Sequence, residues 1–199
     1  METRKVYLVR HGKIRLEDDQ RRYIGQLDLP LSGEGVRQAE SLRKLLGPVG
    51  LATVYCSDLA RSRQTAAIIA GDGGVAVTVR RDLREISLGE WEGCTFAEII
   101  RRFPDEFRAR GADIGYFRVP GGESFADCSQ RVVAAFRDIL AKATGDVAIV
   151  GHAGVNRLLL CHVLGLPLAN LFRLGQDYGC LNVIQCGDTG YQLQLANFR

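Results

Sequence analysis

The chain has 199 residues, of which 46% are hydrophobic and 25% are charged, and this balance is typical of one globular domain with a sizeable core. Its 26 basic and 23 acidic side chains give a net charge of +3, which is too even to indicate a nucleic-acid partner. Because no apolar run is long enough to span a bilayer and no leader-like segment is evident, we expect no membrane partner and a cytoplasmic location.

The six cysteines do not form a recognisable metal or disulfide framework. None stands in a C-x-x-C pair, and no histidine lies at zinc-ligand spacing from one of them. Several lie within apolar patterns, which is typical of reduced core residues. We therefore expect neither a metal site nor disulfides from these positions: Cys56, Cys94, Cys128, Cys161, Cys180 and Cys186.

The first strong pattern is the apolar segment 6–9, which predicts a buried strand ending at Arg10, His11 and Gly12. In open α/β sheets, ligands bind at the carboxyl ends of strands. A polar loop over 13–26 follows at the mouth of any such site. A helix is predicted over 34–46, with Ser32 as its N-cap and Gly47-Pro48 at its end.

The middle of the chain continues the alternation of strands and helices. A strand over 53–56 precedes a helix over 59–70, for which Ser57 or Asp58 is a suitable cap, and Arg61 lies in the first turn of that helix. A third strand is predicted over 75–79. The segment 83–93 contains glycines and acidic residues and is irregular, 95–103 is helical, and 104–116 is basic and poorly periodic.

The last third starts with a turn over 120–124 and a long amphipathic helix that reaches about Ala143. A strand over 146–150 ends in Gly151 and His152, a helix over 155–164 follows, and two terminal strands are predicted over 180–185 and 191–195. This order favours one sheet covered on both faces, in a single domain over 1–199.

Two strands therefore end in a histidine at the same kind of sheet edge. If those ends are neighbours, His11 and His152 converge with Arg10 and Arg61 on one crevice. Guanidinium groups match phosphate oxygens bidentately, and an imidazole among them is able to attack phosphorus. His162 lies within an apolar helix and is interpreted as structural.

Such chemistry also needs an acid to protonate the leaving alkoxide. Glu85, in the irregular segment after the third strand, is the natural candidate. The residue types alone do not separate it from Glu90, Glu92 and Glu98.

The motifs together resemble the histidine phosphatase superfamily, which includes cofactor-dependent phosphoglycerate mutases. They occur in the family's order: Arg10-His11-Gly12, Asp28-x-Pro30-Leu31-Ser32-x-x-Gly35, Ser57-Asp58-Leu59-Ala60-Arg61-x-x-x-Thr65-Ala66, Leu83-x-Glu85-x-x-x-Gly89-x-Trp91-Glu92-Gly93, Pro120-Gly121-Gly122-Glu123-Ser124 and Gly151-His152-Ala153-Gly154.

The resemblance implies a three-layer α/β/α sandwich with a mostly parallel sheet and a small cap over roughly 94–122. It implies that His11 is the nucleophile and Glu85 the proton donor, and that Arg10, Arg61 and His152 hold the phosphoryl group. It also implies that Gly25, Gln26 and Ala153 contact the substrate or its phosphate. It implies no cofactor and no metal.

The chain departs from the family pattern just after Gly12. Family members continue with Glu and Thr and have Asn a few residues on, whereas this chain has Lys13, Ile14 and, at the usual Asn position, Glu17. No phosphate contact is therefore carried over to this loop, and Lys13 is interpreted as a solvated loop residue.

The resemblance favours hydrolysis, because the chain lacks the longer insertion with which a mutase shields its intermediate from water. Its motifs and the segment 177–180 look most like α-ribazole-5′-phosphate phosphatases of cobalamin assembly. The alternatives are a broad sugar-phosphate phosphatase, a phosphoglycerate mutase or a non-enzymatic phosphate-binding scaffold. The expected partner is a small phosphorylated metabolite, with the protein a monomer or homodimer. The basic segment 101–118 is interpreted as a solvated cap surface.

Overall fold

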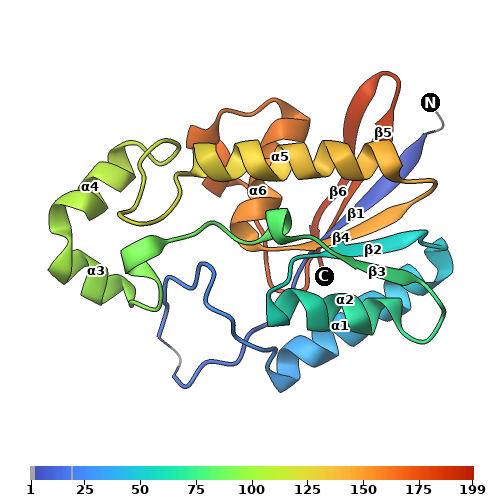
Figure 1. Ribbon diagram of the computed structural model, residues 1–199, viewed down its shortest axis with the longest axis horizontal. Helices are drawn as coiled ribbons and strands as arrows, with labels where there is room; N and C mark the ends of the chain where they lie inside the picture. The colour runs from blue at the N-terminus through green and yellow to red at the C-terminus, as the bar shows by residue number, and fades with distance from the viewer. Residues whose placement is uncertain (1–2, 19) are drawn as a thin grey trace.

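The computed structural model describes residues 3–18 and 20–199. Within them, six strands form one sheet in the order β3-β2-β4-β1-β5-β6 (Figure 1). The strands are β1 (Arg4–Arg10), β2 (Thr53–Cys56), β3 (Ala76–Val79), β4 (Val147–Gly151), β5 (Leu181–Gly187) and β6 (Gly190–Phe198).

The sheet is mixed but mostly parallel, as predicted. β1 pairs in parallel with β4, and β2 pairs in parallel with both β4 and β3. β5 runs antiparallel to both β1 and β6. β4 lies at the centre of the parallel part and all five of its residues are buried, which is the pattern expected of a strand covered on both faces.

Two pairs of helices cover the two faces of the sheet (Figure 1). On one face, α1 and α2 bury Leu42, Ala66 and Ile69 against apolar residues of β1, β2 and β4. On the other face, α5 and α6 form the larger core cluster. These four helices are α1 (Gly33–Leu46), α2 (Ala60–Ala70), α5 (Phe125–Lys142) and α6 (Ala153–Leu164). The result is the predicted three-layer sandwich.

Two short helices, α3 (Phe96–Arg102) and α4 (Pro104–Ala112), stand at one end of the molecule, beyond the sheet (Figure 1). The segment 104–116 was predicted only as basic and poorly periodic, and this description missed α4. This helix buries none of its residues, so it has no apolar periodicity for a sequence pattern to reveal. Pro104 at its start and acidic residues in its first turn are its helix signals.

The starts of two helices differ from the prediction. α2 begins at Ala60, whose backbone N–H donates to Asp28 Oδ1 at 2.6 Å, while Asp58 instead binds Arg84. α6 begins at Ala153, directly after the second strand-end histidine. The helix amides therefore lie closer to the predicted site than the sequence indicated.

The six cysteines are free thiols, five of them buried and Cys94 partly buried. No helix in the described part of the chain is long and apolar enough to cross a membrane.

Candidate active site

The pairing of β1 with β4 brings the two predicted histidines together. Arg10 is the register partner of Gly151, so the next residue of each strand leaves the sheet at the same point. The backbone N–H of His11 donates to the Gly151 carbonyl at 3.1 Å. The ring centroids of His11 and His152 are 5.1 Å apart.

One ring nitrogen of His11 is committed to the backbone. Its Nδ1 lies 2.7 Å from the carbonyl oxygen of Gly12. Because a carbonyl oxygen only accepts, Nδ1 carries the proton and Nε2 keeps its lone pair. Burial, together with the nearby guanidinium groups of Arg61 and Arg10, holds the pKa of His11 well below the usual histidine value. The imidazole is therefore neutral near pH 7, as a nucleophile must be.

His152 is fully buried and both of its ring nitrogens have partners. Arg61 Nε donates to Nδ1 at 3.3 Å, and Nε2 lies 2.8 Å from Ser57 Oγ. Since a guanidinium only donates, Nδ1 is the accepting nitrogen and Nε2 carries the proton. Burial and then Arg61 lower the pKa of His152 well below its usual value. A contact between this ring and a phosphate stays a prediction.

Arg61 is 1% exposed and is held from three sides. Besides the imidazole, its Nη1 donates to the Leu27 carbonyl at 2.6 Å and its Nη2 donates to the Gly25 carbonyl at 2.7 Å. Each of these terminal groups has a second N–H that is not used in these bonds. A fixed cation with donors to spare is suited to hold a phosphoryl group.

Arg10 is fixed by a carbonyl and by an aromatic ring. Its Nη1 donates to the Gln176 carbonyl at 2.6 Å, and its Cζ lies 3.7 Å from the centroid of the Tyr178 ring. Its Nε is buried and has no hydrogen-bond partner among residues 3–18 and 20–199. Since buried donors are almost always paired, this nitrogen is suited to an oxyanion of a ligand.

Glu85 lies at the N-terminus of α6. Its Oε2 accepts from the backbone N–H of Gly154 at 2.9 Å, and its Oε1 accepts from that of Val155 at 3.2 Å. These two bonds hold a carboxyl group from the irregular segment at the start of the helix.

One cavity of about 580 Å³ has four of the five predicted catalytic or phosphate-holding residues in its wall, namely His11, Glu85, Arg10 and Arg61. Gly25 and Ala153 also line it. His152 and Gln26 do not belong to its wall. The side chain of Gln26 instead donates to the Glu85 carbonyl at 2.9 Å.

Of the four candidate acids, only Glu85 lines the cavity, whereas Glu90, Glu92 and Glu98 do not. Glu92 Oε1 accepts from the backbone N–H groups of Gln26 and Leu88. Glu98 forms a capping box with Thr95 at the start of α3.

The divergent loop after Gly12 contributes apolar surface to this cavity. Ile14 is buried and lines the wall together with Leu16, whereas Lys13 and Glu17 do not. Lys13 Nζ pairs with exposed Glu34 at 2.8 Å, in agreement with its interpretation as a solvated residue.

Two motif glycines allow α1 to approach this loop closely. A Cβ on Gly12 would lie 2.3 Å from the Gly35 oxygen, and one on Gly35 would lie 2.1 Å from the Lys13 oxygen. Backbone atoms meet here without side chains between them. The spacing of the first two motifs therefore reflects backbone packing next to His11.

Among the cavity residues that the sequence did not predict are Tyr178, Arg157 and Arg110. The segment 177–180 had contributed to the family resemblance, but nothing in it indicated that the Tyr178 ring stacks on Arg10. Arg110 lies 5.6 Å from the Tyr23 ring and 5.8 Å from the Phe125 ring. It has no hydrogen bond or ion pair with any described residue.

Residues 6–199 match the family described as the histidine phosphatase superfamily, branch 1. The chain belongs to this superfamily. The match covers nearly the whole chain and confirms both the resemblance and the predicted enzyme class, a phosphatase. Members of this kind act on small phosphorylated substrates.

Relatives within the superfamily point in two directions. The chain is 28% identical over 198 residues to the adenosylcobalamin/α-ribazole phosphatase of Escherichia coli K12, covering 98% of this chain and 96% of the relative. The crystal structure of a putative α-ribazole-5′-P phosphatase from E. coli K-12 superposes with a TM-score of 0.90 at 27% identity, over 98% and 97% of the two chains. A mycobacterial glucosyl-3-phosphoglycerate phosphatase complexed with VO3 has a TM-score of 0.87 at 30% identity, over 98% and 100% of the chains.

Proposed function

We propose that the protein hydrolyses a small phosphomonoester through a phosphohistidine on His11, and that α-ribazole 5′-phosphate is its leading substrate. The observation that carries the proposal is the neutral, backbone-anchored imidazole of His11, which faces a cavity together with the buried guanidinium group of Arg61 and the partly buried one of Arg10. We also propose a cytoplasmic enzyme, monomeric or homodimeric, without a nucleic-acid or membrane partner.

In the first step, His11 Nε2 attacks phosphorus while the ester P–O bond breaks. The proton of the Glu85 carboxyl group passes to the departing oxygen, so that an alcohol leaves and a carboxylate remains. Arg10 and Arg61 balance the charge of the phosphoryl oxygens throughout.

In the second step, the Glu85 carboxylate takes a proton from water as the water oxygen attacks phosphorus. The P–N bond breaks, inorganic phosphate forms, and the imidazole of His11 returns to its neutral state. Glu85 ends the cycle protonated, so one group serves first as acid and then as base.

Two observations support α-ribazole 5′-phosphate. The E. coli relative matches almost over its full length, and the cavity offers apolar and aromatic surface beyond the phosphate end. A planar aromatic base fits such a lining. This surface consists of Ile14, Leu16, Tyr23, Ile24, Leu88 and Phe96.

The unpaired guanidinium of Arg110 favours a second candidate, a phosphatase for sugar or glycerate phosphates that carry a further anionic group. The solved relative named for glucosyl-3-phosphoglycerate acts on such a compound. A cation in the cavity wall without an acidic partner would pair with a carboxylate at the far end of the substrate.

Phosphate release from α-ribazole 5′-phosphate, glucosyl-3-phosphoglycerate, 3-phosphoglycerate and fructose bisphosphates tests both candidates. Arg110→Met should lower kcat/KM for the substrates with a second anion and leave α-ribazole 5′-phosphate nearly unchanged. Arg108→Met, at an exposed residue of α4 that pairs with Asp105, is the matched control.

The covalent intermediate is tested by rapid quenching. Wild-type enzyme should form an acid-labile phosphoprotein that His11→Ala abolishes. If wild-type protein forms none and releases phosphate from no ester, the proposed function is wrong.

A further inference from the structure

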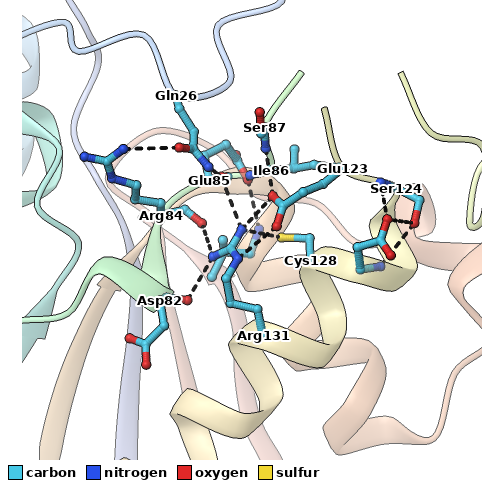
Figure 2. A network of polar contacts seen from close by, with 12 residues as sticks. Gln26, Asp82, Arg84, Glu85, Ile86, Ser87, Glu123, Ser124, Cys128 and Arg131 are labelled. Atoms are coloured by element: carbon cyan, nitrogen blue, oxygen red, sulfur yellow. Dashed lines mark hydrogen bonds and ion pairs between the residues drawn. The ribbon is translucent and has the colours of Figure 1, made fainter. Parts of the chain in front are cut away.

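Arg131, a half-buried residue of α5, binds the backbone of the segment that carries Glu85 (Figure 2). Its Nη1 donates to the carbonyls of Asp82 and Arg84, both at 2.9 Å, and its Nη2 reaches the Glu85 carbonyl at 3.5 Å. A guanidinium has five N–H donors in a rigid fork. A single side chain thus binds three of the four backbone carbonyls of residues 82–85.

Glu123, in the turn before α5, binds both Arg131 and the segment that carries Glu85 (Figure 2). Its Oε1 accepts from Arg131 Nε at 3.0 Å, and its Oε2 accepts from Arg131 Nη2 at 2.8 Å. The same Oε2 accepts from the backbone N–H of Ser87 at 2.9 Å, and the backbone N–H of Glu123 donates to the Ser87 carbonyl, also at 2.9 Å. The ion pair therefore holds the segment on both sides of Glu85.

The turn that carries Glu123 is itself fixed. Ser124 and Asp127 form a capping box at the start of α5. A Cβ on Gly122 would lie 2.7 Å from the Ser87 oxygen, and one on Gly89 would lie 2.1 Å from the Pro120 oxygen. The two motifs that contain these glycines consequently interlock through their backbones.

The segment between β3 and α3 lacks long regular structure and contains two short 3-10 helices. Fixing such backbone costs about 1–2 kcal/mol of conformational entropy per residue, so external contacts must hold it. The Glu85 carbonyl is bound by Gln26 from one side and by Arg131 from the other. Its carboxyl group can then dock on the amides of α6.

We propose that Arg131 and Glu123 act together as positioning residues for Glu85, holding its carboxyl group where it protonates the leaving oxygen. Neither residue lines the cavity, and the hydrogen bonds described above join both to the segment that carries Glu85. A half-buried ion pair contributes little net stability, which leaves the geometry of the acid as its main effect. The inference rests on the proposed function of Glu85.

The test compares two substrates whose leaving groups differ in their need for a proton. An alkyl phosphate needs protonation as its P–O bond breaks and the P–N bond forms, whereas p-nitrophenolate is stable enough to leave as the anion. The comparison uses kcat/KM, which depends only on the steps up to phosphoryl transfer to His11, because Glu85 as the base of the second step serves both substrates alike. Arg131→Met should lower kcat/KM for the alkyl phosphate about tenfold or more, approaching the roughly 10²-fold or larger loss expected for Glu85→Gln. The kcat/KM for p-nitrophenyl phosphate should change much less.

Two further variants make the comparison robust. Glu123→Gln keeps the shape of the side chain but removes its charge, and should shift the alkyl-to-aryl ratio in the same direction by a smaller factor. Asp138→Asn is the control, because Asp138 forms a comparable ion pair with Arg80 two turns further along α5. This control should leave the ratio unchanged even if it lowers the melting temperature.

The ratio of two rates measured on one preparation does not depend on the folded fraction, so partial unfolding cannot imitate the effect. If Arg131→Met yields no folded protein, Arg131→Lys, which keeps the charge but not the fork, and Glu123→Gln carry the test. An unchanged ratio in folded variants, with Glu85→Gln altering it, overturns the inference. A wild-type protein without phosphatase activity, or a Glu85→Gln variant with a normal ratio, overturns the proposed function instead.

Discussion

Gly154→Ala should damage catalysis while leaving the fold intact. Gly154 is in the first turn of α6, and a Cβ there would lie 2.5 Å from Glu85 Oε1 and 3.4 Å from Phe125 Cε1. The backbone of Gly154 needs no positive φ, so alanine fits the helix. The added methyl group acts on the carboxyl group that this turn binds.

The size of the effect follows from these distances. To reach a contact of 3.0–3.4 Å, the Glu85 carboxyl oxygen must retreat by about 0.5–0.9 Å. Misplacement of a reacting group by about 1 Å costs on the order of 10²-fold in rate. We expect kcat/KM for an alkyl phosphate to fall roughly 10- to 100-fold. Stability should hold or rise, because alanine favours a helix by up to about 1 kcal/mol relative to glycine.

Steady-state hydrolysis of an alkyl and an aryl phosphate, with thermal unfolding of the same samples, measures both effects. Gly111→Ala is the matched control, since a Cβ on this glycine of α4 would meet nothing within 4 Å. An alanine variant at Gly154 with wild-type kcat/KM on the alkyl phosphate would refute the proposed place of the acid. So would an equal loss of kcat/KM on both substrates.

Other predictions concern pH and packing. Because burial, Arg61 and Arg10 lower the pKa of His11, the acid limb of kcat/KM due to its protonation should lie below pH 6.5, and Arg61→Gln should move it upward; a pH–rate profile checks this. Below about pH 6.5 the histidines are protonated in the unfolded chain, whereas buried His11 and His152 stay neutral in the folded protein. The free energy of unfolding is therefore at its full value above that pH. It falls as the pH drops towards the lowered pKa values, by up to about 1.4 kcal/mol per pH unit for each histidine. Denaturant unfolding between pH 7 and 5 should show a flatter loss in His152→Asn. Gly35→Ala should cost about 1–3 kcal/mol in the same assay, because its Cβ would meet a backbone oxygen at 2.1 Å.

Sequence patterns predicted the two strand-end histidines because short apolar runs predict buried strands, and parallel strands end at one sheet edge. The structure adds the register, Arg10 opposite Gly151, that turns a shared edge into ring centroids 5.1 Å apart. The motif spacing also selected Glu85, which the residue types alone had left among four carboxyls.

Two kinds of feature could not be predicted. α4 buries none of its residues, so periodicity gives no sign of it. The stacking of Tyr178 on Arg10 and the binding of Arg131 to the Glu85 segment join residues far apart in the chain, and nothing local marks either partner. Family motifs include Gly122 and Glu123, but the sequence does not show that both pack against the backbone of Ser87.

Because of the register of β1 and β4, the candidate site exists only when these two strands have paired. His11 and His152 meet only after β1, near the N-terminus, has paired with β4, which lies in the last third of the chain. Such non-local pairings form late because they close long loops. A partly folded chain in which β4 has not docked beside β1 would therefore lack the proposed phosphate site. Phosphate or vanadate should bind only when this pairing is complete, so the bound anion should stabilise the whole molecule against global unfolding.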